Sequence, residues 1–103
     1  MSIRNRLHNR RPSVTHRLDT EHGRAYVTLG YDIGTCRPYE VFISGPKAGS
    51  SLQALLDDAG VLLSLALQYQ VPIKQLTHSL DHGREEGAKS ILGEVARLLE
   101  ERV

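Results

Sequence analysis

The hydrophobic pattern of the chain changes its period once, at residues 45–50 (GPKAGS). Before this point apolar and polar residues alternate, as in half-buried strands; the alternating segments are 13–20, 24–31 and 38–44. After it, apolar residues recur every three to four positions, as in amphipathic helices; the helical segments are about 51–70, 72–80 and 88–102. Because short turns separate the strands, we expect a three-stranded antiparallel meander followed by a long helix and two further helices.

This β-β-β-α-α-α order is typical of the α+β class, with the helices packed on one face of the sheet. A length of 103 residues predicts one domain. We assign residues 13–103 to that domain and residues 1–12 to a basic N-terminal arm. Five arginines precede the first acidic residue, Asp19: Arg4, Arg6, Arg10 and Arg11 lie in the arm, and Arg17 follows it.

The long helix expected at 51–70 is more apolar than a surface helix needs to be. Its polar positions lie on one narrow stripe, which consists of Gln53, Asp57, Ser64 and Gln68. Almost every other position from Leu52 to Leu67 is apolar. A surface helix usually buries a stripe of about 100°, so one sheet cannot cover this helix. We therefore expect a second partner, either the later helices or another subunit, and predict a homo-oligomer.

The two faces of the predicted sheet differ in character. Alternation places aliphatic residues on one face; they are Ala25, Val27, Leu29, Val41 and Ile43. The opposite face carries Arg24, Tyr26 and Phe42. The two aromatic rings could stack on a nucleobase while Arg17 or Arg24 binds a phosphate. Alternatively, the rings are good strand formers that pack in a subunit interface.

The segment between the sheet and the long helix is a candidate anion site. Lys47, Gly49 and Ser50 stand just before a helix N-terminus, where free backbone N–H groups attract phosphate or carboxylate. It is not a P-loop, because the lysine precedes the last glycine. The alternative is a tight turn in which Ser50 caps the helix in a capping box with Gln53. Arg84, in the polar segment 81–87, is a further candidate anion contact or a plain surface arginine.

Residue types that carry catalysis or bind metals are sparse. Cys36 is the single cysteine, and the histidines are too scattered for a zinc site. We expect no catalytic residue, no metal and no cofactor. A lone thiol, no apolar run long enough for a membrane helix and no signal-peptide pattern indicate a cytoplasmic protein without membrane contact. The arginine arm makes nucleic-acid binding a weaker alternative, because aromatic interleaving and a second basic patch are missing.

The stretch from Tyr26 to Leu76 resembles the TSCPD domain. The segments that carry the resemblance are YVT, RPYEVFI, KAGS and SLALQYQVP, and the later SILGEVARLL is similar to the family's closing segment. The Cys-containing motif that names the family is absent. This domain is found near the C-terminus of vitamin B12-dependent ribonucleotide reductases and as small stand-alone proteins.

The resemblance implies a non-catalytic module with one of two functions. Reductase chemistry uses a large barrel and a further cysteine pair, which a chain with one cysteine cannot supply. Some short phage proteins similar to this family sequester cyclic nucleotide or cyclic ADP-ribose immune signals in pockets between subunits. We favour such a nucleotide-binding function. The alternative is an accessory or remnant ribonucleotide-reductase module that acts through protein–protein contacts.

Overall fold

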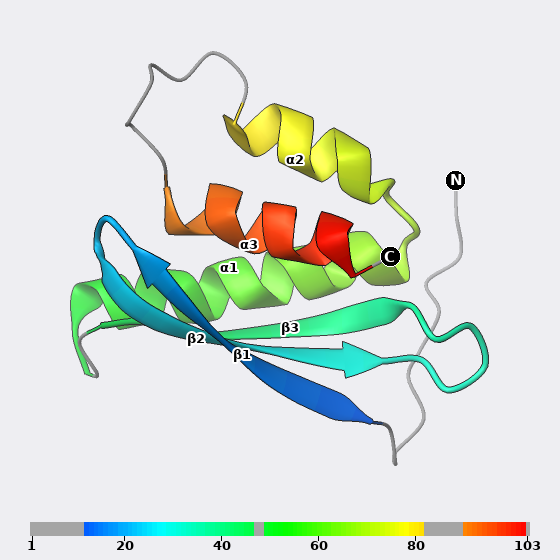
Figure 1. The fold of residues 1–103 in the computed structure, drawn as a ribbon, viewed down its shortest axis with the longest axis horizontal. Helices are drawn as coiled ribbons and strands as arrows, with labels where there is room; N and C mark the ends of the chain where they lie inside the picture. Colours follow the sequence, from blue (N-terminus) through cyan, green and yellow to red (C-terminus); the bar gives the residue numbers. More distant parts are fainter. Residues whose placement is uncertain (1–11, 47–48, 82–89, 103) are drawn as a thin grey trace.

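A computed structural model describes residues 12–46, 49–81 and 90–102 of the chain. The strands are β1 (Ser13–Thr20), β2 (Gly23–Tyr31) and β3 (Pro38–Ser44), and the helices are α1 (Ser51–Gln68), α2 (Ile73–Asp81) and α3 (Ile91–Glu101) (Figure 1). The α+β class and the order of three strands followed by three helices are confirmed. The predicted arm at 1–12 lies almost entirely outside the described residues.

The predicted helix boundaries differ from the observed ones where a cap decides the end. The last helix was expected from residue 88, but it begins at Ile91 because the Ser90 hydroxyl accepts a hydrogen bond from the Gly93 N–H at 3.0 Å. Helix α1 ends at Gln68, because Gln70 adopts a left-handed conformation with φ of 65°. The N–H groups of Gln70 and Val71 then bond back to carbonyls of the last turn, which is a Schellman motif.

The sheet is an antiparallel meander with the order β1-β2-β3. Its register places Val27 opposite His16 on one side and opposite Ile43 on the other. The aliphatic face predicted from the alternation is the buried face, because Ala25, Val27 and Leu29 are fully buried. The core therefore lies between this face and the helices.

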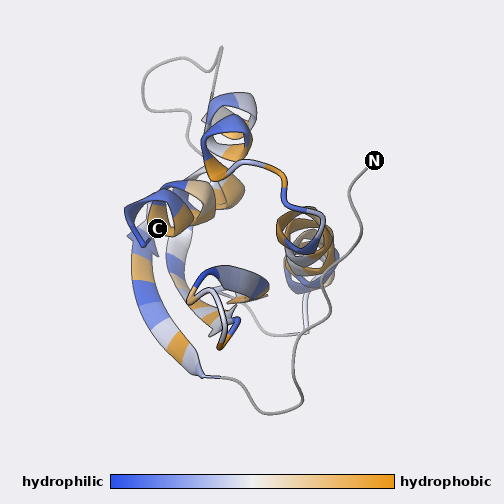
Figure 2. Cartoon of the chain, turned by 90° about the vertical axis from the view of Figure 1, so that its right-hand side faces the viewer, coloured by the Kyte–Doolittle hydropathy of each residue, from blue (hydrophilic) through white to orange (hydrophobic). Residues whose placement is uncertain are grey.

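The helices form two layers above the sheet. Helix α1 lies along β3, and α3 lies beside α1 over the same side of the sheet, while α2 packs on α3 farther from the strands (Figures 1 and 2). The core joins Leu63 of α1 to Val95 and Leu99 of α3. The Thr77 hydroxyl of α2 bonds to the Ala96 carbonyl of α3 at 3.4 Å. As predicted, the helices occupy one face of the sheet.

Candidate binding surface

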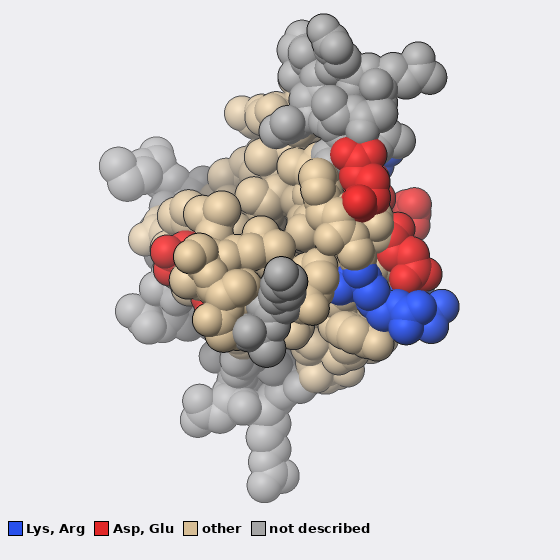
Figure 3. All heavy atoms as spheres, turned by 90° about the vertical axis from the view of Figure 1, so that its left-hand side faces the viewer, with Lys and Arg blue, Asp and Glu red and all other residues tan. Residues whose placement is uncertain are grey.

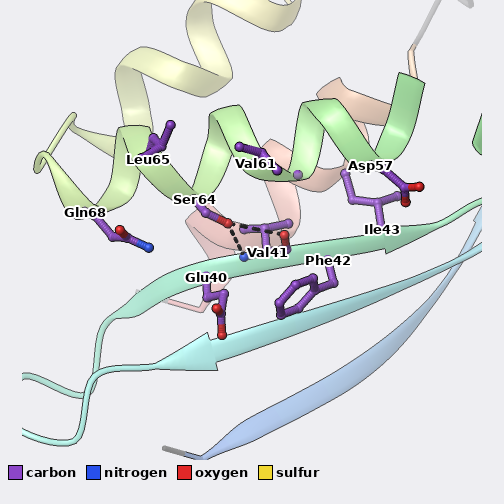
Figure 4. A pocket seen from close by; sticks show the side chains of 10 residues that line it. Glu40, Val41, Phe42, Ile43, Asp57, Val61, Ser64, Leu65 and Gln68 are labelled. Atoms are coloured by element: carbon purple, nitrogen blue, oxygen red, sulfur yellow. Dashed lines mark hydrogen bonds between the residues drawn. The ribbon is translucent and has the colours of Figure 1, made fainter. Parts of the chain in front are cut away.

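The polar stripe of α1 is bonded to the open edge of β3. The Ser64 hydroxyl accepts from the Val41 N–H at 2.8 Å and lies 3.3 Å from the Val41 carbonyl. The Gln68 amide donates to the Tyr39 carbonyl at 3.1 Å, and the Gln53 amide donates to the Ile43 carbonyl at 3.0 Å. Figure 4 shows Ser64 and Gln68 pointing from the helix toward the strand. The stripe thus covers an edge that would otherwise offer free backbone groups to other chains.

This anchoring leaves another side of α1 without cover. Leu55 and Leu62 are 63% and 68% exposed, although leucine is among the residues most often buried. In Figure 2, where α1 is viewed nearly end-on at the right, hydrophobic residues surround most of the helix. In the part of the chain that the structure describes, the later helices do not take up this surplus apolar surface. Another subunit as its partner stays a prediction.

We define the outer face of α1 by the residues that share this uncovered side. They are Leu55, Asp58, Leu62, Leu65 and the C-cap residue Tyr69. All are exposed except Leu65, which is half-buried. The face contains one carboxylate and one phenol among leucines.

A groove runs between the outer face of α1 and strand β3. It has a volume of about 410 Å³, and its apolar lining includes Val61, Leu65 and Phe42, whose side chain is 57% exposed (Figure 4). Glu40 and Asp57 also line it. Two carboxylates disfavour a phosphate in this groove by like-charge repulsion. An apolar or weakly cationic side chain of another molecule fits its lining better. The sequence pattern did not reveal this groove, because it depends on how the helix docks against β3.

The predicted cationic site on the sheet is already charge-compensated. Arg24 Nε donates to Asp19 Oδ1 at 3.0 Å, and Arg17 Nη2 lies 3.7 Å from the second carboxylate oxygen. The hydrogen bond to Asp19, followed by one to Tyr26, raises the pKa of Arg24 above its ordinary value. Figure 3 shows basic side chains of this end of the molecule lying against acidic ones. A phosphate would have to compete with Asp19 for these guanidinium groups.

The two aromatic candidates lie on the predicted face. Tyr26 faces Ser44 across the β2–β3 pair, and Phe42 faces Thr28, so the two rings stand diagonally on neighbouring strands. Both side chains are exposed on the side of the sheet away from the core. The predicted sidedness of the strands is confirmed, and a ligand role for the two rings stays a prediction.

The structure describes only part of the predicted anion site. The Ser50 hydroxyl accepts from the Gln53 N–H at 3.2 Å, which confirms Ser50 as the cap of α1. Gly49 has φ of 72°, a left-handed conformation that suits glycine. Lys47 and Arg84 lie outside the described residues. The Ser50 hydroxyl is thus engaged within the chain, and anion binding at this loop stays a prediction.

The described residues contain neither a metal site nor a membrane-spanning helix. They contain no cluster of three or more metal-ligating side chains, and Cys36 is exposed in the turn between β2 and β3. None of the described helices is both long enough and apolar enough to cross a bilayer.

Comparison with known proteins identifies relatives of a single kind. They are vitamin B12-dependent ribonucleotide reductases from Rhodopirellula baltica (34% identical), Agrobacterium fabrum (29%) and Bradyrhizobium diazoefficiens (30%). The matches cover 93%, 87% and 90% of this chain. They span only 10%, 7% and 7% of the reductases, so the chain corresponds to a small part of each. No solved structure matches the chain.

A model of the TSCPD domain matches residues 3–103, which is nearly the whole chain. Of the segments that carry the resemblance, YVT and RPYEVFI fall mainly on β2 and β3, and SLALQYQVP spans the end of α1. KAGS precedes α1 in the chain, and SILGEVARLL falls on α3. The chain belongs to the TSCPD domain family.

Proposed function

We propose that this chain is a non-catalytic assembly module that binds another protein through the outer face of α1 and the adjoining groove. The observation that carries the proposal is the exposure of Leu55 and Leu62 on a helix that is already fixed along β3. Burying one such side chain contributes about 1.5–3 kcal/mol. Two leucines therefore offer several kcal/mol toward association, from which the cost of lost translational and rotational freedom must be subtracted.

The relatives support a role within a larger assembly. In each reductase this domain accounts for a tenth of the length or less, so it is one part among many. In such an assembly this chain acts as an accessory reductase module through protein–protein contacts. Contiguous apolar surface of this kind usually marks a protein–protein contact.

Nucleotide sequestration is a second candidate function. The exposed rings of Tyr26 and Phe42 favour it, because aromatic side chains stack on bases. The charged side chains of the described residues favour nucleotide binding less, because Glu40 and Asp57 line the groove and Arg24 is paired with Asp19. Phosphates would then need cations from a second subunit or from residues outside the described part.

Native mass spectrometry of the purified chain distinguishes the two functions. One set of samples contains a panel of linear and cyclic nucleotides, and the other contains a vitamin B12-dependent reductase lacking its own TSCPD domain. A complex, with the reductase or with a second copy of the chain, that is lost in Leu62→Glu supports the assembly module. If the chain binds an intact nucleotide at fixed stoichiometry and forms neither complex, its function is nucleotide sequestration and the assembly module is wrong. A chain that stays monomeric and binds neither overturns both functions.

A further inference from the structure

The outer face of α1 has the spacing of a coiled-coil seam. Its members Leu55, Asp58, Leu62, Leu65 and Tyr69 follow one another at intervals of three, four, three and four residues. This is the a/d repeat with which one helix packs against another. The core-facing side of α1 already packs on its own sheet and on α3. The helix thus carries a second packing stripe that its own fold does not use.

We propose that a second copy of this chain occupies that stripe, with its α1 antiparallel to the first and outer face against outer face. This inference rests on the proposed function, because it names the partner for the same surface. A two-fold axis between the helices makes one surface patch serve both chains.

The charges on the outer face select the antiparallel arrangement. A parallel pair in register would place Asp58 against Asp58 of the second copy, and two carboxylates in an apolar seam repel each other. In an antiparallel pair with Leu62 opposite Leu65 of the second copy, Asp58 faces Tyr69 of the second copy at both ends. A carboxylate accepts and a phenol donates, so each supplies the partner that the other needs.

Neither polar group of this pair has a competing partner among the described residues. No hydrogen bond or ion pair joins the Asp58 carboxylate or the Tyr69 hydroxyl to the rest of the described chain. The neighbouring Asp57 differs, because its carboxylate accepts from the Gln53 amide at 2.7 Å. A polar pair at each end of an otherwise apolar seam fixes the register, as a polar residue at an a position does in coiled coils.

The size of the surface sets the expected strength. Stable interfaces bury about 1,200–2,000 Å² in total, and in this register the paired part of the outer face, from Asp58 to Tyr69, spans only about 16 Å of helix. The groove extends it, because Leu65 belongs to the outer face and also lines the groove beside Phe42. We therefore expect a reversible dimer that dissociates on dilution.

Light scattering over a concentration series tests the interface. The wild-type chain is expected to pass from monomer to dimer, and Leu62→Glu is expected to stay monomeric throughout. Ile33→Glu is the matched control, because Ile33 is 55% exposed in the turn after β2 and lies outside the interface. It should dimerise like the wild type. Circular dichroism checks that both variants fold, which their exposed positions favour.

Cysteine cross-linking tests the register in a Cys36→Ser background. The double variant Asp58→Cys/Tyr69→Cys should form a covalent dimer when copper–phenanthroline oxidises the two thiols to a disulfide. Within one chain these positions lie about 16 Å apart along the helix, and a disulfide needs Cα atoms within about 7 Å. The bond therefore joins two chains. Asp58→Cys alone and Tyr69→Cys alone should remain monomers on a non-reducing gel.

Each contrary result removes a defined part of the inference. A wild-type chain that is monomeric up to about 1 mM, where even very weak pairing registers, overturns the dimer. A dimer that survives Leu62→Glu overturns α1 as its interface. A covalent dimer of Asp58→Cys alone overturns the register. If the wild type is monomeric yet still binds the reductase, the dimer is wrong and the assembly function stands.

Discussion

Replacing Ser64 by alanine removes the bridge between the middle of α1 and β3. Val41 is buried, and both its N–H and its carbonyl lie within bonding distance of the Ser64 hydroxyl. Leaving a buried backbone group unsatisfied costs about 1–3 kcal/mol. Ser64 lines the groove, so water can reach the freed groups in part and the cost falls in the lower half of that range. The higher helix propensity of alanine stabilises α1 by about 0.5 kcal/mol, which offsets part of this cost.

The expected net loss is about 1 kcal/mol, which lowers the Tm by about 4–8 °C for a domain of this size. Thermal unfolding at fixed protein concentration measures it, with Ser51→Ala as the matched control. Ser51 is the exposed first residue of α1, so this variant changes helix propensity without removing a bond to β3. Amide hydrogen exchange at Val41 gives a local readout and should accelerate only in Ser64→Ala.

Equal stability of the two variants, together with unchanged exchange at Val41, would refute this account of the edge. Helix α1 would then be held along β3 by apolar packing alone, and the hydroxyl would contribute nothing. A loss of unfolding free energy well above 3 kcal/mol would also contradict this account. Two hydrogen bonds cannot contribute that much, so Ser64 would have a further role in the fold.

Three further changes test other parts of the fold, each by denaturant unfolding. Gln70→Gly should stabilise the chain by about 0.5–1 kcal/mol, because glycine adopts the left-handed conformation of this residue without strain; no gain would contradict the Schellman cap. Gly60→Ala should destabilise it by about 1–2 kcal/mol despite better helix propensity, because the added methyl would lie 2.9 Å from the Val41 carbonyl oxygen; a gain would show that α1 can move away from β3. His16→Leu should stabilise it by about 1 kcal/mol, because Nε2 of His16 is buried with no hydrogen-bond partner among the described residues; a loss would indicate a partner for that nitrogen.

Elements with one dominant environment were predictable from the sequence. The strands at 13–20 and 38–44 have the predicted bounds. One face of β3 is buried, and alternate residues of β1 from His16 onward are half-buried, so both strands show the alternation. The start of α1 was predictable from Ser50, because serine is a preferred N-cap residue whose hydroxyl bonds a free N–H of the first turn. The pairing of Arg24 with Asp19 was also predictable from the sequence. The two-residue turn after Thr20 sets a register in which Asp19 stands opposite Arg24.

The use of the polar stripe was not predictable from periodicity. Periodicity marks only which positions are polar. It does not distinguish polar side chains that contact water from those that bond to a strand edge, as Gln53, Ser64 and Gln68 do. The side-chain types are more informative than the periodicity, because amides and hydroxyls both donate and accept hydrogen bonds. An open strand edge presents N–H and carbonyl groups in alternation and needs side chains of that kind. A charged side chain can only donate or only accept, so it could bond one kind of edge group but not both.

The same anchoring explains why the described part of the chain leaves the outer face of α1 uncovered. Bonds from the helix to β3 at Gln53, Ser64 and Gln68 span nearly its whole length, so the helix cannot rotate to bury Leu55 or Leu62 in the core. Rotation would break those bonds and expose the edge of β3 together with the core side of α1. Folding therefore depends on one stripe of the helix, and the association proposed above uses another. Substitutions on the outer face should change association while leaving the unfolding free energy of the monomer nearly unchanged.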